Sequence, residues 1–221
     1  MTSKKSHQKL FRNNFGDIKE ILSDIEGYNF REDPLSFFIL LARYKFSTRF
    51  IKKSHKVIDA GCGHGQGSIF LSKYANEVIG GDFDDELIKK NNNDFSEIKN
   101  LKFKKLDLAN LSSTHKNKYD VVVSMDVIEH FKKRDVGKIA KNYSKLLKKD
   151  GFAIIGTPNV ASKKFASKRR LSSHPFEFDY DFFEDTLSKA FKNVFVFTMT
   201  DEIVSTQFPK MSWYLMAICT K

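Results

Sequence analysis

Residues 57–82 read VIDAGCGHGQGSIFLSKYANEVIGGD, and this stretch decides the fold. A short apolar run passes into a glycine-rich turn, an amphipathic run follows, and a second apolar run ends at Asp82. This is the pattern of a strand, a turn, a helix and a second strand. Glycines let a ligand approach the backbone, and a terminal acid accepts hydrogen bonds from ribose hydroxyls. The stretch therefore predicts a site for an adenosine-containing cofactor.

The spacing of the glycines narrows the choice of cofactor. Dinucleotide-binding turns follow the pattern G-x-G-x-x-G. Counted from Gly61 the sixth position is Gln66, and counted from Gly63 it is Ser68, so neither register fits. A phosphate-binding P-loop is excluded too, because no Gly-Lys-Ser/Thr sequence follows the turn. The turn therefore need not hold a pyrophosphate.

Strand and helix patterns alternate along the rest of the chain. A helical face is expected at 15–25, and an N-cap acid before proline, Asp33-Pro34, starts a second helix that should run to about residue 51. Strands are expected at 56–60, 77–81, 101–106, 119–124 and 152–156, and helices at 66–74, 84–92, 132–147 and 181–191. Two last strands, at 194–199 and 213–220, should pair antiparallel because no helix pattern separates them.

This alternation predicts an α/β fold. We expect a Rossmann-like, doubly wound, mostly parallel seven-stranded sheet with an antiparallel last strand and helices on both faces. Right-handed crossovers place the carboxyl ends of the strands along one edge, where ligands bind. An N-terminal helical cap is expected at 1–55 and the cofactor domain at 56–221. A long irregular segment at 158–180 breaks the alternation, and such segments in compact domains are functional loops or disordered.

Composition sets limits on the class of protein. The 221 residues are enough for one sizeable domain, and 41% of them are hydrophobic. The net charge of +11 permits an anionic partner without requiring one. No apolar run approaches the ~20 residues that cross a bilayer, so we expect a cytoplasmic protein without membrane insertion. Cys62 and Cys219 lack a metal-ligand spacing, and we expect reduced cysteines and no metal-ligand cluster.

Several motifs in order resemble those of class I S-adenosylmethionine-dependent methyltransferases. Asp59-x-Gly61-x-Gly63-x-Gly65 resembles motif I of that family. Similar motifs follow: a ribose-binding acid at 81–84, an adenine-reading segment at 106–108, YDVVVSMDVIEH at 119–130, LLKKDG at 146–151 and TPN at 157–159. The resemblance covers roughly residues 43–221. It implies an S-adenosylmethionine-dependent methyltransferase that releases S-adenosylhomocysteine, with an acceptor loop at 158–180.

The helix before the first strand also resembles that of a subgroup in which an R-Y-x-F sequence leads into motif I. Many members of this subgroup methylate small metabolites or sugars of surface polysaccharides. The resemblance implies methyl transfer to O or N of a small metabolite, sugar-like or phosphorylated. Two alternatives stay open: an RNA or protein methyltransferase using its basic surface, and a non-catalytic S-adenosylmethionine-binding module. Residues 124–127 read SMDV rather than an Asn-Pro-Pro-Tyr-type motif, which disfavours methylation of nucleic-acid bases.

The resemblance also assigns residues to the cofactor. Asp59 is expected to orient the turn formed by Gly61, Gly63 and Gly65, and Asp82 to bind the ribose, with an exposed strand-end acid as its structural alternative. Other expected contacts are Phe83 beside the adenine, Asp107 and Leu108 at the adenine amino group, and Met125 over the adenosine or sulfonium. Arg43 or Tyr44 should close the pocket and bind the methionyl carboxylate, unless they only pack an amphipathic helix.

A hydroxyl acceptor must lose a proton, and an imidazole suits that task. His130, after the fourth strand, and His174, in the loop, are the catalytic candidates, each with a structural or solvated alternative. The basic run at 163–170 has three interpretations: a solvated face, a clamp for a phosphorylated or nucleotide-linked acceptor, or a nucleic-acid patch. The partner expected first is a small acceptor that can be anionic, and the sequence does not predict the oligomeric state.

Overall fold

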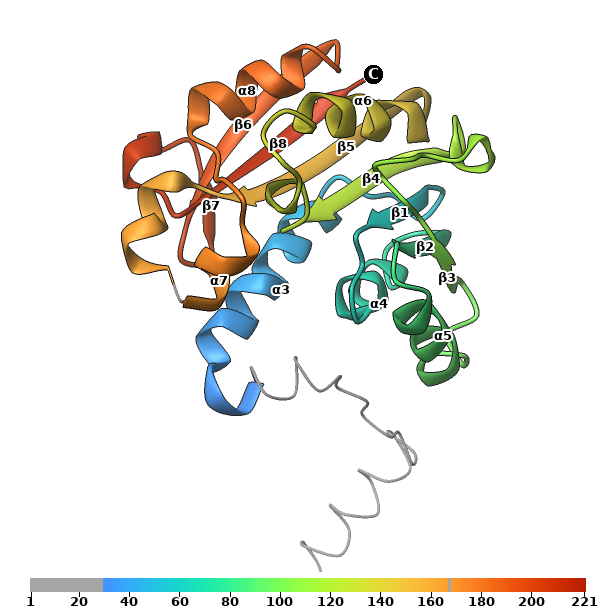
Figure 1. The fold of residues 1–221 in the computed structure, drawn as a ribbon. Coiled ribbons are helices and arrows are strands. Elements are labelled where there is room, and N and C mark those ends of the chain that lie inside the picture. The colour runs from blue at the N-terminus through green and yellow to red at the C-terminus, as the bar shows by residue number, and fades with distance from the viewer. Residues whose placement is uncertain (1–29, 167) are drawn as a thin grey trace, which may run out of the picture.

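The structure is a computed structural model that describes residues 30–166 and 168–221 (Figure 1). The chain forms an eight-stranded sheet in the order β3-β2-β1-β4-β5-β8-β6-β7. The first five strands run parallel, and β8 pairs antiparallel with both β5 and β6. The predicted fold class is confirmed. The sheet has one strand more than expected because the short β7 pairs with the end of β6.

The strands lie close to the ranges expected from the sequence. They are β1 (Lys56–Ala60), β2 (Glu77–Asp82), β3 (Leu101–Lys105), β4 (Tyr119–Met125), β5 (Leu147–Pro158), β6 (Asn193–Thr200), β7 (Ile203–Ser205) and β8 (Tyr214–Thr220). The antiparallel pairing of the last two expected strands is confirmed. The fifth strand starts earlier than expected because Leu147 already pairs with Tyr119 across a register shift.

The helices are α3 (Pro34–Thr48), α4 (Gln66–Ser72), α5 (Asp85–Asp94), α6 (Val136–Leu146), α7 (Lys168–Ser173) and α8 (Tyr180–Ser188). Short 3-10 helices are η1 (Ser113–His115), η2 (Ile128–His130), η3 (Val160–Phe165) and η4 (Pro209–Met211). The helix expected at 15–25, and part of the cap expected at 1–55, lie outside the described residues. Within the described residues, no helix has both the length and the apolar character that a membrane span requires.

Two helix boundaries differ from the expected ones for local reasons. Helix α3 begins as predicted, because the Asp33 carboxylate accepts a hydrogen bond from the Ser36 amide at 3.3 Å. It ends at Thr48 rather than residue 51, where the Thr48 hydroxyl donates to the Lys45 carbonyl and competes with helical bonding. Helix α6 begins four residues later than expected, because a turn from Lys132 to Asp135 precedes it.

The segment expected to be an irregular loop at 158–180 contains helical turns. It holds η3 and α7, and the Val160 amide donates to the Phe178 carbonyl at 2.8 Å. Asn159 and Phe178 also form an isolated parallel bridge. This pairing folds the segment back along the end of β5, so that its two ends lie side by side.

Alternation along the strands separates two hydrophobic cores. Ile58 and Val122 face the layer of α6 and α8, whereas Val57 and Val121 face the layer of α3 and α4 (Figure 1). Because helices cover both faces of the sheet, the edge formed by the carboxyl ends of the parallel strands is the part left for ligand binding. Its parallel strands end level with one another, since Ala60 pairs with Gly81 and Met125 pairs with Gly156. The segments after β1, β2, β4 and β5 therefore meet at this edge.

Candidate active site

The glycine turn after β1 has a conformation that suits glycine. Gly61, Gly63 and Gly65 have φ values of +88°, +49° and +88°, in the left-handed region. A Cβ at Gly61 would lie 2.3 Å from a Val127 methyl group, so the loop after β4 packs tightly on the turn. A Cβ at Gly63 would meet no described atom within 4 Å. The turn is therefore braced at Gly61 and open to a ligand at Gly63.

The Asp82 carboxylate ties this turn to the end of β2. It accepts hydrogen bonds from the Gly63 amide at 3.0 Å and from the Asp84 amide at 3.1 Å. A carboxylate offers about four lone-pair sites, so capacity remains for a ribose hydroxyl. Phe83, next in the chain, is 74% exposed and presents an open aromatic face. An open glycine turn, a carboxylate and an exposed ring fit an adenosine group.

Two further predicted cofactor residues lie after β3. The Asp107 carboxylate accepts hydrogen bonds from the Ala109 and Asn110 amides and from the Asn110 side chain. Burial would raise the pKa of Asp107, but these donors and Lys138 outweigh it and lower the pKa. Leu108 differs from the expectation, because its side chain is buried in the core that faces α6. A side-chain contact of Leu108 with the cofactor is therefore not supported.

Asp59 and Tyr44 form a buried pair beneath the glycine turn. Asp59 is fully buried and accepts hydrogen bonds from the Ser68 hydroxyl at 2.7 Å and from the Tyr44 hydroxyl at 3.4 Å. Burial raises the pKa of Asp59 to about 7. The Tyr44 ring fills the space that a Cβ at Gly67 would need, 1.9 Å from the nearest ring carbon. Tyr44 therefore packs α3 onto α4, as its structural alternative predicts, and Asp59 supports the turn from below.

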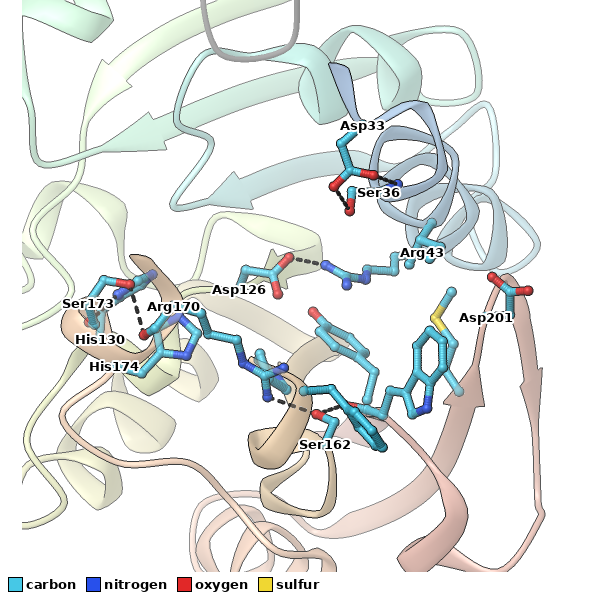
Figure 2. Close-up of a pocket in the computed structure, with 16 residues that line it drawn as sticks. Asp33, Ser36, Arg43, Asp126, His130, Ser162, Arg170, Ser173, His174 and Asp201 are labelled. Atoms are coloured by element: carbon cyan, nitrogen blue, oxygen red, sulfur yellow. Dashed lines mark hydrogen bonds and ion pairs between the residues drawn. The ribbon is translucent and has the colours of Figure 1, made fainter. Parts of the chain in front are cut away.

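A cavity of about 670 Å³ opens at the ends of β4 and β5 (Figure 2). It is lined by α3, the loop after β4, the 158–180 segment and the strands at the far end of the sheet. The loop after β4 joins the two features, because its Val127 packs on Gly61 while Asp126 and His130 line the cavity. None of the described residues that line the cavity belongs to the glycine turn, so the loop after β4 is what links the two features.

Arg43 lies in the wall of this cavity. Its guanidinium forms an ion pair with Asp126 and stands 3.8 Å from the centre of the Tyr214 ring (Figure 2). Burial would lower the pKa of Arg43, but Asp126, Tyr214 and Glu129 outweigh it and raise the pKa. Asp126 has φ +57°, a costly conformation for a non-glycine residue that is found at functional sites. The expected contact of Arg43 with a methionyl carboxylate requires this ion pair to open.

Met125, the last residue of β4, is buried next to Tyr214, on whose ring the Arg43 guanidinium stacks. A Cβ at Gly156 would lie 2.7 Å from the Met125 sulfur and from the Tyr214 ring. The Tyr214 hydroxyl lies 4.0 Å from that sulfur. Met125 thus lies at the end of β4 beside Gly156 and Tyr214, and its expected place beside the sulfonium stays a prediction.

The structure brings His130 and His174 together although they lie far apart in the sequence. Their ring centres are 4.9 Å apart at 82°. His130 Nδ1 contacts the Ser173 carbonyl at 3.0 Å, and His174 Nδ1 contacts a Glu177 carboxylate oxygen at 3.1 Å. Burial lowers the pKa of His174, against the opposing effect of Glu177. Both rings line the cavity, where a group that handles protons is expected.

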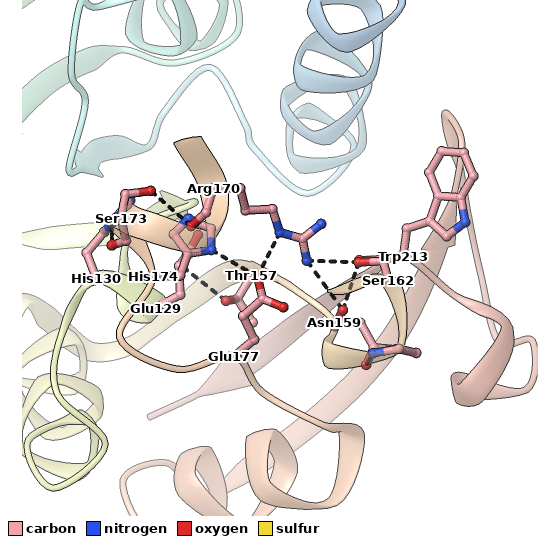
Figure 3. A network of polar contacts seen from close by, with 11 residues as sticks. Glu129, His130, Thr157, Asn159, Ser162, Arg170, Ser173, His174, Glu177 and Trp213 are labelled. Atoms are coloured by element: carbon pink, nitrogen blue, oxygen red, sulfur yellow. Dashed lines mark hydrogen bonds and ion pairs between the residues drawn. The ribbon is translucent and has the colours of Figure 1, made fainter. Parts of the chain in front are cut away.

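Sequence analysis missed a polar network at the same site (Figure 3). Arg170 donates to Glu177 at 2.7 Å and to the Ser162 hydroxyl at 2.8 Å, and so turns into the cavity. Lys163, Lys164 and Lys168 of the same basic run are exposed. The run is therefore divided between the cavity wall and the protein surface. The spacing of these basic residues along the sequence does not show which of their side chains face the cavity.

Glu129 is the second group that was missed. It is fully buried, and its ligand atoms, with those of His130 and His174, lie within 4.8 Å of one another. Spacing along the chain predicts no metal-ligand cluster, whereas the fold assembles three potential ligands. Glu129 follows directly from the strand-four motif, but the partner His174 comes from the folded-back segment, which one sequence does not place.

Comparisons with known proteins agree with this geometry. Residues 57–151 match the family described as "Methyltransferase domain". A Mycobacterium tuberculosis protein named "Probable S-adenosylmethionine-dependent methyltransferase" is 27% identical over 69% of this chain and 50% of its own length. The "Ubiquinone biosynthesis O-methyltransferase" of Pelagibacter ubique is 32% identical over 51% of this chain and 46% of its own length. The chain spans about half the length of the curated relatives it matches.

A solved structure supports the fold. The TehB-like SAM-dependent methyltransferase from Corynebacterium glutamicum is 20% identical, covers 98% of this chain and 97% of its own, and superposes with a TM-score of 0.62. At this identity the likeness concerns the fold alone. The family match and the named relatives agree with the resemblance drawn from the sequence, and the solved structure agrees with the predicted fold.

Proposed function

We propose that this chain, whose residues 57–151 match the family described as "Methyltransferase domain", is a class I S-adenosylmethionine-dependent methyltransferase that transfers a methyl group to an oxygen or nitrogen of a small polar acceptor. The observation that carries the proposal is the loop after β4. Its Val127 braces the glycine turn at Gly61, and its Asp126 and His130 line the cavity. A cofactor on the turn and an acceptor in the cavity would then be neighbours.

The residues of the turn fit S-adenosylmethionine. We assign the ribose to Asp82, the adenine to the region of Phe83 and Asp107, and the close backbone approach to Gly63. When bound, this cofactor supplies a methyl group on a positively charged sulfur, which is already electrophilic. The protein then contributes mainly proximity and alignment, which supply up to ~7–11 kcal/mol in favourable cases.

The lining of the cavity favours a hydroxyl-bearing or sugar-like acceptor. Trp213, which is about half exposed, offers a flat apolar face, while Ser162, Arg170 and Asp126 offer hydrogen-bonding groups. Flat aromatic faces with polar groups around them suit a ring that carries hydroxyls. The name of the Pelagibacter ubique relative, an O-methyltransferase, supports oxygen as the atom that is methylated.

Exposed lysines keep a second acceptor class open. Lys163 and Lys164 on η3 and Lys168 on α7 belong to the segment that lines the cavity, and their charges favour a phosphorylated acceptor. The same surface is what an RNA or protein methyltransferase would use. A non-catalytic module that only binds the cofactor is the remaining alternative, and turnover separates it from both enzymes.

Calorimetry with S-adenosylmethionine and S-adenosylhomocysteine tests the cofactor. We expect binding by the unmodified protein and at least tenfold weaker binding by Asp82→Asn. Asp85→Asn is the matched control, because Asp85 lies on the same side of the sheet but pairs with Lys105 on the surface. Equal binding by Asp82→Asn and the unmodified protein would contradict the assignment.

A labelled-methyl assay tests the acceptor. Cell extract divided into small-molecule, RNA and protein fractions is incubated with the protein and methyl-labelled S-adenosylmethionine. We expect label in the small-molecule fraction. Label confined to RNA or protein would favour the second class, and binding without transfer to any fraction would favour the non-catalytic module.

A further inference from the structure

Glu129, His130 and His174 form a cluster outside the glycine turn, in which His130 and His174 line the cavity and Glu129 is fully buried beside them (Figure 3). Glu129 and His130 belong to η2, directly after β4, while His174 follows α7. Two imidazoles and one carboxylate are the ligand set of catalytic zinc sites and of other transition-metal sites with open positions.

The geometry of the three ligand atoms is close to that of a metal site. They lie within 4.8 Å of one another. Tetrahedral ligands ~2.1 Å from one ion stand about 3.4 Å apart. The side chains therefore need to approach by at most about 1.4 Å, which small rotations of the side chains supply.

The hydrogen-bond partners of the two histidines also support a metal site. The Ser173 carbonyl and the Glu177 carboxylate accept from Nδ1 of His130 and His174, at 3.0 and 3.1 Å. These acceptors place the ring proton on Nδ1 and leave Nε2 with its lone pair available. Metal-binding histidines almost always hold their second nitrogen in this way, and loss of such a partner typically costs 10–100-fold in affinity.

Glu129 provides an independent observation. Its Oε2 accepts from the Thr157 hydroxyl at 3.0 Å, but its Oε1 is buried and has no hydrogen-bond partner among the described residues. A buried carboxylate oxygen without a hydrogen-bond partner is costly, and a bound cation would satisfy it. Among the described residues no guanidinium hydrogen-bonds to this oxygen. Arg43 pairs with Asp126, although its charge also acts on Glu129 and its Nε has no partner among the described residues, and Arg170 pairs with Glu177.

We propose that Glu129, His130 and His174 bind one divalent transition-metal ion, whose open positions face the cavity and take a hydroxyl oxygen of the acceptor. The mixed nitrogen and oxygen set favours Zn²⁺, Mn²⁺ or Co²⁺ over Mg²⁺ and Ca²⁺, which prefer oxygen ligands. The part of this inference that concerns the acceptor rests on the proposed function, whereas the metal site itself does not.

The ion gives the acceptor a defined position and an easier loss of its proton. A metal ion lowers the pKa of a bound water or hydroxyl, so the coordinated hydroxyl releases its proton to solvent. Its oxygen stays on the metal with the electron pair that attacks the methyl carbon. No oxidant or reductant is needed, because the metal keeps its oxidation state. The two histidines then act as ligands, and neither serves as the general base.

Metal binding is measured on the full chain after removal of metal with a chelator. Titration with Mn²⁺ followed by electron paramagnetic resonance, and with Co²⁺ followed by visible absorption, should each give one equivalent. His130→Ala and His174→Ala should bind at least tenfold more weakly, and the nitrogen couplings in the Mn²⁺ signal should diminish. Glu177→Ala, which removes the acceptor of the His174 Nδ1–H group, should cost 10–100-fold in metal affinity.

His115→Gln is the matched control, because His115 lies on η1, contacts Tyr119 and is outside the cavity. Its metal affinity should equal that of the unmodified protein. Glu129 is buried, so Glu129→Gln is informative only if its circular dichroism and S-adenosylmethionine binding remain normal. If they do not, the variants of the exposed His130 and the half-buried His174 provide the test. Unchanged affinity in the His130→Ala, His174→Ala double variant, or no saturable binding at millimolar metal, would overturn the proposal.

The design separates this inference from the proposed function. Calorimetry of the metal-free protein reports cofactor binding without the metal. Cofactor binding and full methyl transfer in excess chelator would reject the role of the metal toward the acceptor and leave the methyltransferase intact, while the Mn²⁺ and Co²⁺ titrations decide on the metal site itself. Failure to bind the cofactor in any metal state would reject the proposed function, whatever the Mn²⁺ titration shows.

Discussion

Substitution of Gly61 by alanine should break the link between the glycine turn and the cavity. Gly61 has φ +88°, and its Cβ would lie 2.3 Å from a Val127 methyl group. The left-handed conformation costs ~1–2 kcal/mol for a residue with a Cβ. Overpacking against Val127 adds ~1–3 kcal/mol. We therefore expect Gly61→Ala to lower the free energy of unfolding by about 2–5 kcal/mol and to weaken cofactor binding.

The two costs can be separated by a second substitution. Val127→Ala removes the methyl groups that the new Cβ would meet, but it leaves the backbone strain. The Gly61→Ala, Val127→Ala double variant should therefore recover about 1–3 kcal/mol relative to the sum of the single variants. Urea unfolding of the four proteins, followed by circular dichroism, measures this coupling energy.

Gly137→Ala is the control for an ordinary glycine. Gly137 lies in α6, and a Cβ there would meet nothing within 4 Å among the described residues. This variant should be more stable than the unmodified protein by ~0.5–1 kcal/mol. Stability of Gly61→Ala within 0.5 kcal/mol of the unmodified protein, or strict additivity in the double variant, would refute the steric account of the turn.

Three other substitutions test the packing, the charges and the cavity. Burial raises the folded-state pKa of Asp59 from 3.8 to about 7, so its contribution to stability is fully present below about pH 4 and is lost as pH rises through about 7. Asp59→Asn should therefore remove about 2.5 kcal/mol of the stability difference between pH 5 and pH 7.5, measured by urea unfolding at the two pH values. Gly67→Ala should cost ~1–3 kcal/mol and expose the α3 amides to hydrogen exchange, because its Cβ would meet the Tyr44 ring, and an unchanged exchange rate would contradict this contact. Arg170→Lys should raise KM for the acceptor and leave S-adenosylmethionine affinity unchanged, because Arg170 lines the cavity; equal kinetics would remove it from acceptor binding.

The sequence predicted the sheet well because its signals are local. The buried run at Tyr119–Met125 and the cap at Asp33 depend on neighbours in the chain, and both appear as expected. The glycines, Asp59 and Asp82 were found because a turn after one strand and an acid after the next must meet at the sheet edge. Leu108 shows the limit of this reasoning, since which face its side chain takes depends on packing against α6.

The cavity was far less predictable, because it depends on one long-range pairing. The Asn159–Phe178 bridge folds the 158–180 segment back and so brings His174 beside His130. Asn159 contributes further, as its side chain donates to the Ser212 carbonyl at 3.1 Å and to the Pro209 carbonyl at 2.9 Å, which fixes the chain before Trp213. A single sequence carries no signal for these contacts, and Glu129 and Glu177 therefore acquired a role only in three dimensions.

The two candidate roles of the histidines make opposite predictions for combined variants. A general base acts through one ring, so loss of that ring should lower kcat and loss of its neighbour should have a separate, smaller effect. Two ligands of one ion act as a unit, and removing either releases the metal. Residues that act as a unit give strongly non-additive effects. We therefore expect the His130→Ala, His174→Ala double variant to lose no more activity than either single variant. Multiplicative losses in kcat, together with indifference to chelator, would instead return one histidine to the role of base.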